Sequence, residues 1–536
     1  MIKKLPNYIL ATLSALFLSL AWYSPFTIFI FVGFVPLFII ENNISKSEIS
    51  KRKKLKLIGS IYLALFLWNL GVTWWLFYAS IEGALLAIIC NPIFMCMVFI
   101  AWYNLKKRIN KPWAIWLFIP LWLGYEYGHT LWDLSWSWLT LGNAFSFAPN
   151  WVQWYEYTGT SGGSLWVLVV NILIFELIKN NTYTFKNFSR PASLVIAPIA
   201  FSYLIFYFNS TPNQQQASSK KPNTYRTLVV QPNVDPYNEK FFFAPETQLA
   251  SLIKQISPKL DSTIDFLVLP ETFLTENIFE TEEFNSYSFR FLRDSILKQY
   301  PKLTIICGSN TNYAFKPNEP LSSTARKFTD DDSYYDSFNT GIQYNSEGIV
   351  LYHKSKLVPG VERMPFPGLL KPLEGLAINL GGTFGSQGTQ KERTVFFSHD
   401  KKVGIAPVIC YESVYSDFVT GYIRNGANMI FVITNDGWWS DSPGHKQHLA
   451  LSVLRAIETR REIARCANTG ISCFISPYGQ IEQQTKYWED AMIVKDMSPN
   501  NQITFYVKFG DVISYVATML AILLIAWSQI LRFKKS

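Results

Sequence analysis

VGIAPVICYE, at residues 403–412, is a run of mostly apolar residues that stops at three chemically active side chains, Cys410, Tyr411 and Glu412. A short, continuous apolar run is typical of a strand that is buried on both faces. Four more runs have this character: RTLVVQPN (226–233), DFLVLPE (265–271), LTIICGSN (303–310) and MIFVITND (429–436). We therefore expect buried β-structure throughout this region of the chain.

Helical patterns lie between or after these strands, over Thr247–Ile256, Phe284–Gln299 and His448–Arg465. Strands that alternate with helices predict a layered α/β domain. In such folds, ligands bind beyond the carboxyl ends of the strands. The polar residues that follow the apolar runs are therefore candidate site residues by position alone: Glu271, Cys410, Asn435 and Asp436.

The chain as a whole is more apolar than this domain. Of its 536 residues, 49% are hydrophobic and 16% are charged, whereas a soluble protein has about 25% charged residues. The mean hydropathy of +0.11 indicates that a strongly apolar part is averaged with a polar one. Eight stretches are apolar enough to predict membrane-spanning helices: Tyr8–Trp22, Phe26–Ile40, Leu57–Tyr78, Ala84–Tyr103, Trp113–Leu123, Ser161–Ile178, Pro191–Phe208 and Val512–Leu531.

Positive charge indicates how these stretches are oriented. The net charge is +9, but residues 209–531 are nearly balanced, with 30 Lys and Arg against 32 Asp and Glu. The excess lies in every second connection, while the connections at 23–25, 79–83 and 124–160 contain no Lys or Arg. By the positive-inside rule, both termini are expected in the cytoplasm and residues 209–510 outside the membrane. Charge distributed in this way disfavours nucleic acid as a partner.

Three domains are expected from this pattern. Residues 1–208 hold spans one to seven, residues 209–510 form an extracytoplasmic domain, and residues 511–536 hold span eight and a cytoplasmic tail. The first span lacks a small-residue cleavage site and is followed by more spans, so we expect it to be retained. Ionisable residues are sparse within the spans, which disfavours an ion pump or a proton-coupled transporter.

Cys410 has two interpretations on sequence grounds. A free cysteine is most often a small buried apolar residue, whereas a nucleophilic cysteine needs a proton acceptor and a nearby positive charge. Glu271 is the expected acceptor, because apolar neighbours at a strand end should raise its pKa towards the thiol range. Lys354, in LYHKSKLVP, is the candidate cation, although a surface lysine is the common case.

No metal site is expected. The six cysteines lack CxxC pairing and so give no zinc signature. His445 and His448 form an HxxH without a third ligand, and we expect them at the N-terminus of a helix. Cys466 and Cys473 are either free thiols or a disulfide pair.

Four motifs resemble those of the nitrilase family of carbon-nitrogen hydrolases, whose members use a Glu-Lys-Cys triad. They are LVLPET (267–272), YHKSKLVP (352–359), ICYES (409–413) and TNDGWWSDSPG (434–444). The combination of these motifs with eight spans resembles the apolipoprotein N-acyltransferase branch of that family. The same branch is similar to a further block at residues 448–480, HLALSVLRAIETRREIARCANTGISCFISPYGQ. The resemblance implies a multi-pass α-helical membrane domain of eight spans and an α/β nitrilase-like domain, an α-β-β-α sandwich.

The resemblance also implies roles for residues at matching positions. It makes Glu271 the general base, Lys354 the partner of the thiolate and the oxyanion, and Cys410 the acylated nucleophile. Four more residues match supporting or substrate-binding positions: Glu362, Tyr411, Glu412 and Trp438. Two departures from the family pattern are present. The family usually has Phe-Gly-Glu where this chain has Gly360, Val361 and Glu362, and Phe241 stands where a Trp is usual.

The implied activity is the transfer of a fatty acyl chain from a phospholipid to the N-terminal α-amine of a diacylated lipoprotein cysteine. The acyl group would pass through a thioester on Cys410, which predicts ping-pong kinetics. The implied partners are a phospholipid acyl donor, a diacylated apolipoprotein acceptor and membrane lipids, with no cofactor, no metal and no nucleic acid. The implied location is the bacterial inner membrane, with a periplasmic catalytic domain in a monomeric chain.

Two other functional classes stay open on the sequence alone. One is a membrane-tethered, nitrilase-like amidase that acts on a small carbon-nitrogen substrate with the same triad. The other is a non-catalytic lipid-binding or scaffolding membrane protein, for which the three triad residues would be dispensable.

Overall fold

The computed structural model describes residues 2–46, 51–210, 224–280, 285–330, 332–366 and 386–533. Residues 211–223, and residues 534–536 of the predicted tail, lie outside this range. The chain forms two compact units. The helical unit comprises Met1–Phe77, Ile81–Thr211 and Phe509–Ser536, and the α/β unit comprises Tyr78–Ser80 and Pro212–Lys508.

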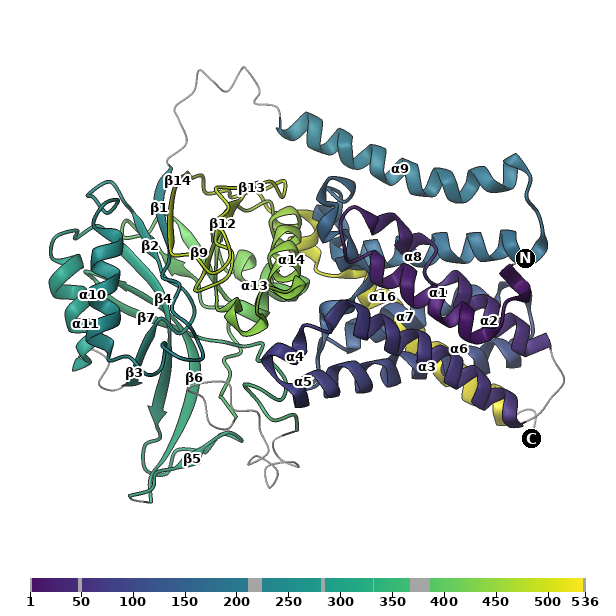
Figure 1. Cartoon of the computed structure of the whole chain (residues 1–536), viewed down its shortest axis with the longest axis horizontal. Coiled ribbons are helices and arrows are strands. Elements are labelled where there is room, and N and C mark those ends of the chain that lie inside the picture. Colours follow the sequence, from purple (N-terminus) through teal and green to yellow (C-terminus); the bar gives the residue numbers. More distant parts are fainter. Residues whose placement is uncertain are drawn as a thin grey trace. The chain divides into compact units, whose positions relative to one another are not determined.

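The helical unit is a bundle of apolar α-helices joined by short 3-10 and π turns (Figure 1). The α-helices are α1 (Asn7–Leu20), α2 (Val35–Lys46), α3 (Lys51–Thr73), α4 (Leu76–Ala79), α5 (Ile81–Leu85), α6 (Asn91–Ile109), α7 (Phe118–Gly128), α8 (Tyr155–Asn180), α9 (Phe185–Ser210) and α16 (Val512–Phe533). The turns are Phe26–Phe31, Leu86–Cys90, Pro112–Leu117, Ser137–Leu139, Leu141–Phe147 and Pro149–Trp151.

Six helical segments of the described residues are long and apolar enough to cross a membrane: Phe26–Lys46, Arg52–Thr73, Ile81–Ile109, Tyr155–Asn180, Phe185–Asn209 and Val512–Ile530. They correspond to the second, third, fourth, sixth, seventh and eighth predicted spans. The first predicted span forms α1, of 14 residues, which is about 21 Å long and shorter than the ~30 Å hydrocarbon layer. The fifth predicted span covers the 3-10 helix Pro112–Leu117 and the first part of α7, which has 11 residues. The prediction of eight spans is therefore not confirmed.

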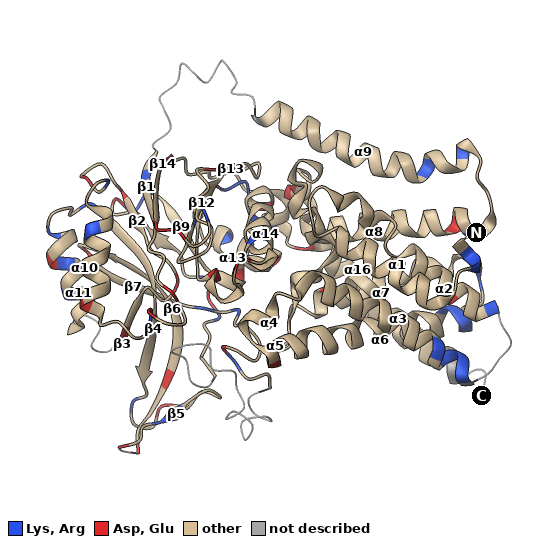
Figure 2. Cartoon of the chain, viewed as in Figure 1, with Lys and Arg blue, Asp and Glu red and all other residues tan. Residues whose placement is uncertain are grey.

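Basic residues of the helical unit gather at the end of the bundle where both termini lie (Figure 2). Contacts between distant segments hold this end together. Nζ of Lys3 donates to the carbonyl of Lys179 at 3.0 Å, and Arg108 donates to the carbonyl of Ser528. Lysines and arginines in the last turns of helices also offset the negative ends of the helix dipoles.

Two β-sheets lie face to face in the α/β unit (Figure 1). The strand order of the first sheet is β14-β1-β2-β4-β6-β5, with β3 beside β4 and β7 beside β6, and that of the second is β13-β12-β11-β10-β9-β8. The first sheet contains β1 (Tyr225–Gln231), β2 (Phe266–Val268), β3 (Leu274–Phe279), β4 (Thr304–Ala314), β5 (Arg326–Lys327), β6 (Tyr334–Asn345), β7 (Gly348–His353) and β14 (Ala491–Met497). The second contains β8 (Phe396–Phe397), β9 (Gly404–Ile409), β10 (Ala427–Thr434), β11 (Ile463–Ala467), β12 (Cys473–Ile475) and β13 (Ile481–Glu482).

Helices cover the outer face of each sheet and complete an α-β-β-α sandwich (Figure 1). α10 (Pro245–Ile256) and α11 (Tyr287–Leu292) cover the first sheet, and α13 (Ser416–Arg424) and α14 (Pro443–Thr459) cover the second. On the first sheet, Leu249 and Leu252 of α10 are buried in one apolar cluster with Leu228 and Leu267. The predicted fold class, a helical membrane domain with a nitrilase-like sandwich, is confirmed apart from the number of spans.

Parallel strands in both sheets determine where the site forms. β1, β2 and β4 are parallel, and so are β9, β10 and β11. The inner faces of the sheets meet at Phe266 and Phe431, whose rings contact edge to face at a centroid distance of 5.3 Å. The polar residues that follow β2, β9 and β10 can therefore meet across the two sheets.

Two predicted helices end earlier than the sequence pattern suggested. The helix expected over His448–Arg465 ends at Thr459, and β11 begins at Ile463. Arg460 has a left-handed backbone with φ +51°, which terminates the helix, and the next residues pair with β10. The helix expected over Phe284–Gln299 is reduced to α11 and a π turn at Arg293–Leu297, and Phe284 lies outside the described residues.

Replacing Phe431 by alanine should destabilise the sandwich strongly. Phe431 is fully buried, so the substitution leaves a cavity between the sheets at a cost of about 3–5 kcal/mol. The measurement is the thermal unfolding midpoint of the full chain in detergent. Phe397→Ala, at a side chain that is 41% exposed, is the matched control and should change the stability by only about 0.5 kcal/mol. Equal midpoints for the two variants would contradict the assigned contact.

Candidate active site

Cys410 lies where strand β9 ends and a short 3-10 helix, η12 (Cys410–Val414), begins. Its backbone is in the left-handed region, with φ +48°, which is costly for a residue that has a Cβ. Two groups stabilise this conformation by donating to the Cys410 carbonyl: Oγ of Ser413 at 2.8 Å and Nε2 of His448 at 3.1 Å. Cys410 remains partly exposed at the carboxyl edge of the second sheet.

Glu271 lies in the turn that follows strand β2 of the first sheet. The next residue, Thr272, also has a left-handed backbone, with φ +49°. Gly308 of β4 lies so close to this turn that an added Cβ would be 2.5 Å from Thr272 N and 2.8 Å from Glu271 Cα. Only glycine lets the turn approach β4 in this way, and the approach leaves Glu271 buried.

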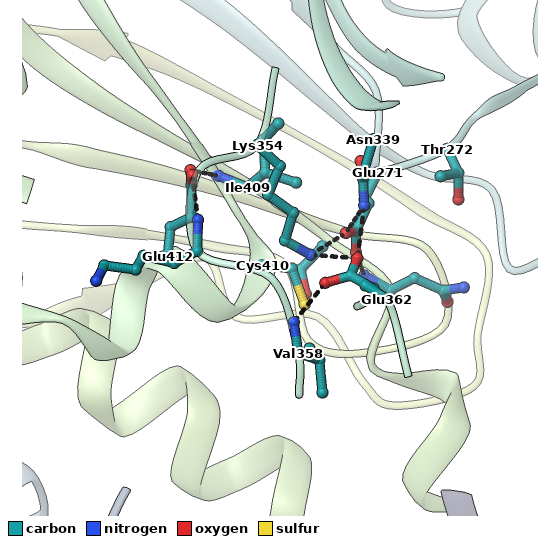
Figure 3. A network of polar contacts seen from close by, with 12 residues as sticks. Glu271, Thr272, Asn339, Lys354, Val358, Glu362, Ile409, Cys410 and Glu412 are labelled. Carbon is teal, nitrogen blue, oxygen red and sulfur yellow. Dashed lines mark hydrogen bonds and ion pairs between the residues drawn. The ribbon is translucent and has the colours of Figure 1, made fainter. Parts of the chain in front are cut away.

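Lys354 follows strand β7 and places its ammonium between two carboxylates (Figure 3). Its Nζ is 2.9 Å from Glu271 Oε1 and 2.8 Å from Glu362 Oε1. Nδ2 of Asn339 donates to the same two oxygens, at 2.8 and 2.9 Å. The Cys410 side chain lies beside this group (Figure 3). The structure therefore brings together four of the residues that the sequence predicted.

Burial opposes the charges of Glu271 and Lys354, but the surrounding groups outweigh it. Burial would raise the pKa of Glu271, yet Lys354, Asn339 and Lys240 together hold this pKa below its ordinary value. Burial would lower the pKa of Lys354, yet Glu271 and Glu362 hold it well above its ordinary value. The expectation that Glu271 has a raised pKa is therefore wrong. Its apolar neighbours are visible in the sequence, but the two lysines reach it only in the fold.

The Cys410 thiol tends to stay protonated. Burial and the Glu271 carboxylate raise its pKa well above the ordinary value, and Lys354 offsets part of this rise. The resting site therefore holds a carboxylate, an ammonium and a neutral thiol side by side. An ionised Glu271 next to a protonated thiol is the arrangement that general-base catalysis requires.

Glu412 fixes the backbone next to Lys354 and Cys410. Its Oε1 accepts from the backbone N–H of Ser355 at 2.7 Å and from the hydroxyl of Tyr352 at 2.6 Å. Its Oε2 accepts from the backbone N–H of Ile409 at 2.9 Å. This buried carboxylate thereby connects the residue after Lys354 to the residue before Cys410, so it positions two site residues through their neighbours.

The two predicted site aromatics lie in different surroundings. Tyr411 is buried, and its ring meets that of Tyr415 edge to face at 5.2 Å. Trp438 is partly exposed in the 3-10 helix η13 (Asp436–Trp439), and its ring lies 5.0 Å from that of Tyr237. Trp438 therefore borders the loop at residues 235–243, which also carries Phe241.

A buried ionic network supports the turn at Cys410. Asp436 accepts from Arg465 Nη2 at 2.6 Å and contacts His448 Nδ1 at 2.9 Å, while His448 Nε2 lies at the Cys410 carbonyl. The structure places His448 near the N-terminus of α14, as predicted, and Asp436 two residues after the end of β10. The network therefore connects the ends of β9 and β10 through two side chains that are almost fully buried.

Cys410, Asp436 and His448 offer three potential metal ligands, with atoms within 4.8 Å of one another. The Arg465 guanidinium, however, contacts both Asp436 and His448. A cation already neutralises this carboxylate, so we interpret the cluster as a hydrogen-bond network. The six cysteines are free, and the alternative of a Cys466–Cys473 disulfide is not realised.

Sequence reasoning missed four residues that shape the site: Gly308, Asn339, Lys240 and Arg465. Gly308 had a local signal, because glycine inside a strand often marks a close backbone approach. Lys240 stands before three phenylalanines in KFFF, an unusual place for a charge. Asn339 and Arg465 lie within strands β6 and β11 and can be recognised only from their partners in the fold.

Asp436→Asn should destabilise the protein, because it leaves the buried Arg465 guanidinium without its counter-charge. Breaking a buried ion pair by removing one partner costs about 3–5 kcal/mol. The expected result is a clear fall in the thermal unfolding midpoint of the full chain at pH 7. Asp441→Asn is the control, since the Asp441 side chain is 78% exposed. An unchanged midpoint for Asp436→Asn would refute this role of the network.

Comparisons with known proteins find two matching families and several similar structures. The carbon-nitrogen hydrolase profile matches residues 235–502, and the profile of the apolipoprotein N-acyltransferase N-terminal domain matches residues 14–173. Among solved structures, Saccharomyces cerevisiae Nit3, a member of branch 10 of the nitrilase superfamily, is 15% identical. The match covers 54% of this chain and 95% of that one, with a TM-score of 0.37.

Curated relatives match both units. The apolipoprotein N-acyltransferase of Chlorobaculum tepidum is 28% identical over 467 residues, 86% of this chain and 85% of that protein. The apolipoprotein N-acyltransferase of Geobacter metallireducens is 22% identical over 529 residues, 95% of this chain and 92% of that protein. The chain thus belongs to the carbon-nitrogen hydrolase family of enzymes, in the branch of the apolipoprotein N-acyltransferases.

Proposed function

We propose that this enzyme transfers a fatty acyl chain from a phospholipid to the N-terminal α-amine of a diacylated lipoprotein cysteine. The observation that carries the proposal is the Lys354 ammonium, 2.9 Å from Glu271 and 2.8 Å from Glu362, beside a partly exposed Cys410. A base, a cation and a thiol in this arrangement suit covalent acyl transfer. The names of the relatives support the choice of donor and acceptor.

In the first half-reaction, Sγ of Cys410 attacks the carbonyl carbon of the phospholipid ester, and its proton moves to the Glu271 carboxylate. These two events occur together, because the raised pKa of Cys410 and the lowered pKa of Glu271 make a free thiolate costly. The tetrahedral intermediate collapses by breaking the ester C–O bond. Glu271 returns the proton to the departing lysophospholipid oxygen, and a thioester remains on Cys410.

Lys354 stabilises the negative charge that develops on the carbonyl oxygen. Glu362 holds its ammonium in place, and Asn339 donates to the two carboxylates that face it, before the reaction starts, so little reorganisation is needed. When Glu271 takes the thiol proton, its attraction for Lys354 weakens and the ammonium can favour the oxyanion. Removing a preorganised donor of this kind typically lowers the rate by about 10²–10³.

In the second half-reaction, the neutral α-amine of the acceptor attacks the thioester carbonyl. Glu271 accepts a proton from the attacking nitrogen, the C–S bond breaks, and the proton returns to the sulfur of Cys410. The products are an amide on the acceptor and the resting thiol. Tyr411, Glu412 and Trp438 act as supporting residues in this proposal, through the contacts described above.

The apolar helices and the bacterial relatives indicate a bacterial membrane protein. We place the enzyme in the inner membrane, with both termini cytoplasmic and the α/β unit periplasmic, acting as a monomer. The basic end of the helical bundle, which holds both termini (Figure 2), supports this orientation. Both substrates are lipids, so a site at a membrane surface lets their acyl chains enter from the bilayer.

Wild-type enzyme incubated with phosphatidylethanolamine–phosphatidylglycerol vesicles should gain one fatty acyl mass on the peptide that contains Cys410. The adduct should be released by hydroxylamine, because it is a thioester. Cys410→Ala should give no adduct, and Glu271→Gln should slow its formation by about 10²–10⁴, the usual contribution of a general base. Intact-protein and peptide mass spectrometry measure both outcomes.

Cys90→Ala is the control for this experiment, since Cys90 is another partly exposed cysteine. It should keep the full adduct on Cys410. The rival amidase predicts instead that vesicles leave Cys410 unmodified while a small amide is hydrolysed in a Cys410-dependent way. That result would replace the acyltransferase proposal.

The rate of acyl-enzyme formation should not fall between pH 7 and pH 5. Glu271 accepts a proton only as a carboxylate, and its pKa is held below its ordinary value, which is about 4.3 for glutamate. The carboxylate form therefore dominates over this whole range and is lost only at lower pH. Single-turnover acylation rates across the range provide the measurement. A loss of rate with a midpoint near pH 6 would instead support a raised pKa.

A further inference from the structure

A second buried lysine, Lys240, lies next to the triad and has no part in the mechanism above. Only 1% of it is exposed, although lysine is rarely fully buried without partners. It belongs to the loop between β1 and α10, in which Phe242 and Phe243 are 77% and 46% exposed. In this loop the charged side chain is buried and two aromatic side chains are exposed, which is the reverse of the usual distribution of charged and apolar side chains.

The contacts of Lys240 run to the turn that carries the general base. Its Nζ donates to the backbone carbonyl of Glu271 at 2.9 Å and to Oγ1 of Thr272 at 2.6 Å. Thr272 has the left-handed backbone described above, a conformation that persists only where the surroundings stabilise it. Lys240 therefore helps to hold the turn that directs the Glu271 carboxylate towards Lys354.

Hydrogen bonds fix the backbone of the loop that carries Lys240, so they also fix the position of this residue before a substrate binds. The Asp235 carbonyl accepts from the backbone N–H groups of Glu239 and Lys240 at 3.1 and 2.9 Å. Nδ2 of Asn468 donates to the Val234 carbonyl at 2.7 Å. These bonds connect the loop to the segment that follows β11 and hold its backbone where Lys240 enters the site.

Lys240 also changes the charge balance of the buried site. Glu271, Glu362 and Lys354 together carry a formal charge of −1, and Lys240 brings the total to zero. Burial lowers the pKa of Lys240 to about 8, while the two titratable groups that face it, Glu271 and Cys410, oppose this decrease. The attraction is mutual, so charged Lys240 also favours the ionised forms of Glu271 and Cys410.

We propose that Lys240 is a positioning residue, which fixes the Glu271 turn and neutralises the site while Cys410 loses its proton. The proposal deepens the acyl-transfer function above and rests on it for the identity of the reaction. It predicts that the ammonium of Lys240 favours the thiolate below pH 8. As the pH rises through about 8, Lys240 loses its charge and no longer stabilises the thiolate.

The test is the rate at which iodoacetamide alkylates Cys410 in the full chain, measured by peptide mass spectrometry between pH 6.5 and 9.5. Lys240→Met should react about tenfold more slowly than wild type at pH 7, equivalent to a rise of about one unit in the thiol pKa. The two rates should converge above pH 8, because both side chains are then neutral. Lys254→Met, which removes an exposed lysine of α10, should match wild type throughout.

Lys240→Arg separates the charge from the shape of the side chain. Its guanidinium keeps its proton across this range, so above pH 8 it should be alkylated severalfold faster than wild type. This comparison remains decisive if Lys240→Met fails to fold, which a thermal melt would reveal. The proposal would be overturned if Lys240→Arg and wild type were alkylated at equal rates at pH 9. It would also be overturned if the ratio of the alkylation rates of wild type and Lys240→Met did not vary with pH.

Acylation from the phospholipid vesicles by the same variants separates this proposal from the proposed function. If wild type is alkylated at Cys410 but never acylated, the proposed function fails while the alkylation profile still decides the role of Lys240. If wild type is acylated but the alkylation profiles of wild type and both Lys240 variants coincide, the acyltransferase function stands and Lys240 has no positioning role.

Discussion

The Lys354 ammonium, which has almost no access to water, is the interaction on which the site depends. An unpaired buried charge costs several kcal/mol, so Lys354 requires the carboxylates of Glu271 and Glu362 within 3 Å. The same contacts stabilise Glu271 as a carboxylate. The requirements of folding and of the proposed chemistry therefore coincide, since the pair that makes burial tolerable also provides a carboxylate beside a thiol.

Bringing these groups together requires two strained turns, one on each sheet. Cys410 and Thr272 both have left-handed backbones, with φ +48° and +49°. The first is stabilised by His448 and Ser413 at the Cys410 carbonyl. The second is stabilised by Lys240 and by the close approach that Gly308 permits. The sandwich brings the ends of β2 and β9 together, and these local contacts direct the two side chains towards each other.

The polar residues around Glu271, Lys354 and Cys410 form two groups. One group contacts the charged side chains, and the other bonds to backbone groups. Glu362 keeps Lys354 in place and Asn339 holds the two carboxylates that face it, whereas Glu412 and His448 fix the peptide groups beside Cys410. In the proposed mechanism, this division accounts for the reactivity of a neutral thiol with a raised pKa. Its proposed base, its cation and its backbone are all in position before a substrate arrives, so little of the activation barrier would arise from reorganisation.

Features that depend on neighbouring residues could be predicted from the amino-acid sequence alone. The apolar strands, the apolar helices with their basic connections, and the motifs around Glu271, Lys354 and Cys410 could all be recognised without coordinates. The helix expected through Arg465 was too long because apolar spacing does not separate a helix from a buried strand. The first predicted span is a helix of only 14 residues, and the fifth is divided between a 3-10 helix, Pro112–Leu117, and α7.

The ionisation of the site, and the residues that control it, depend on contacts that form when the chain folds. The direction of the Glu271 pKa depends on Lys354, which is 83 residues away along the chain, and on Lys240, which is 31 residues away. Asn339 and Arg465 have no local signal in the sequence. The physical reason is that electrostatic interactions depend on distance in space and on exclusion of water, and neither quantity is defined until the two sheets have packed together.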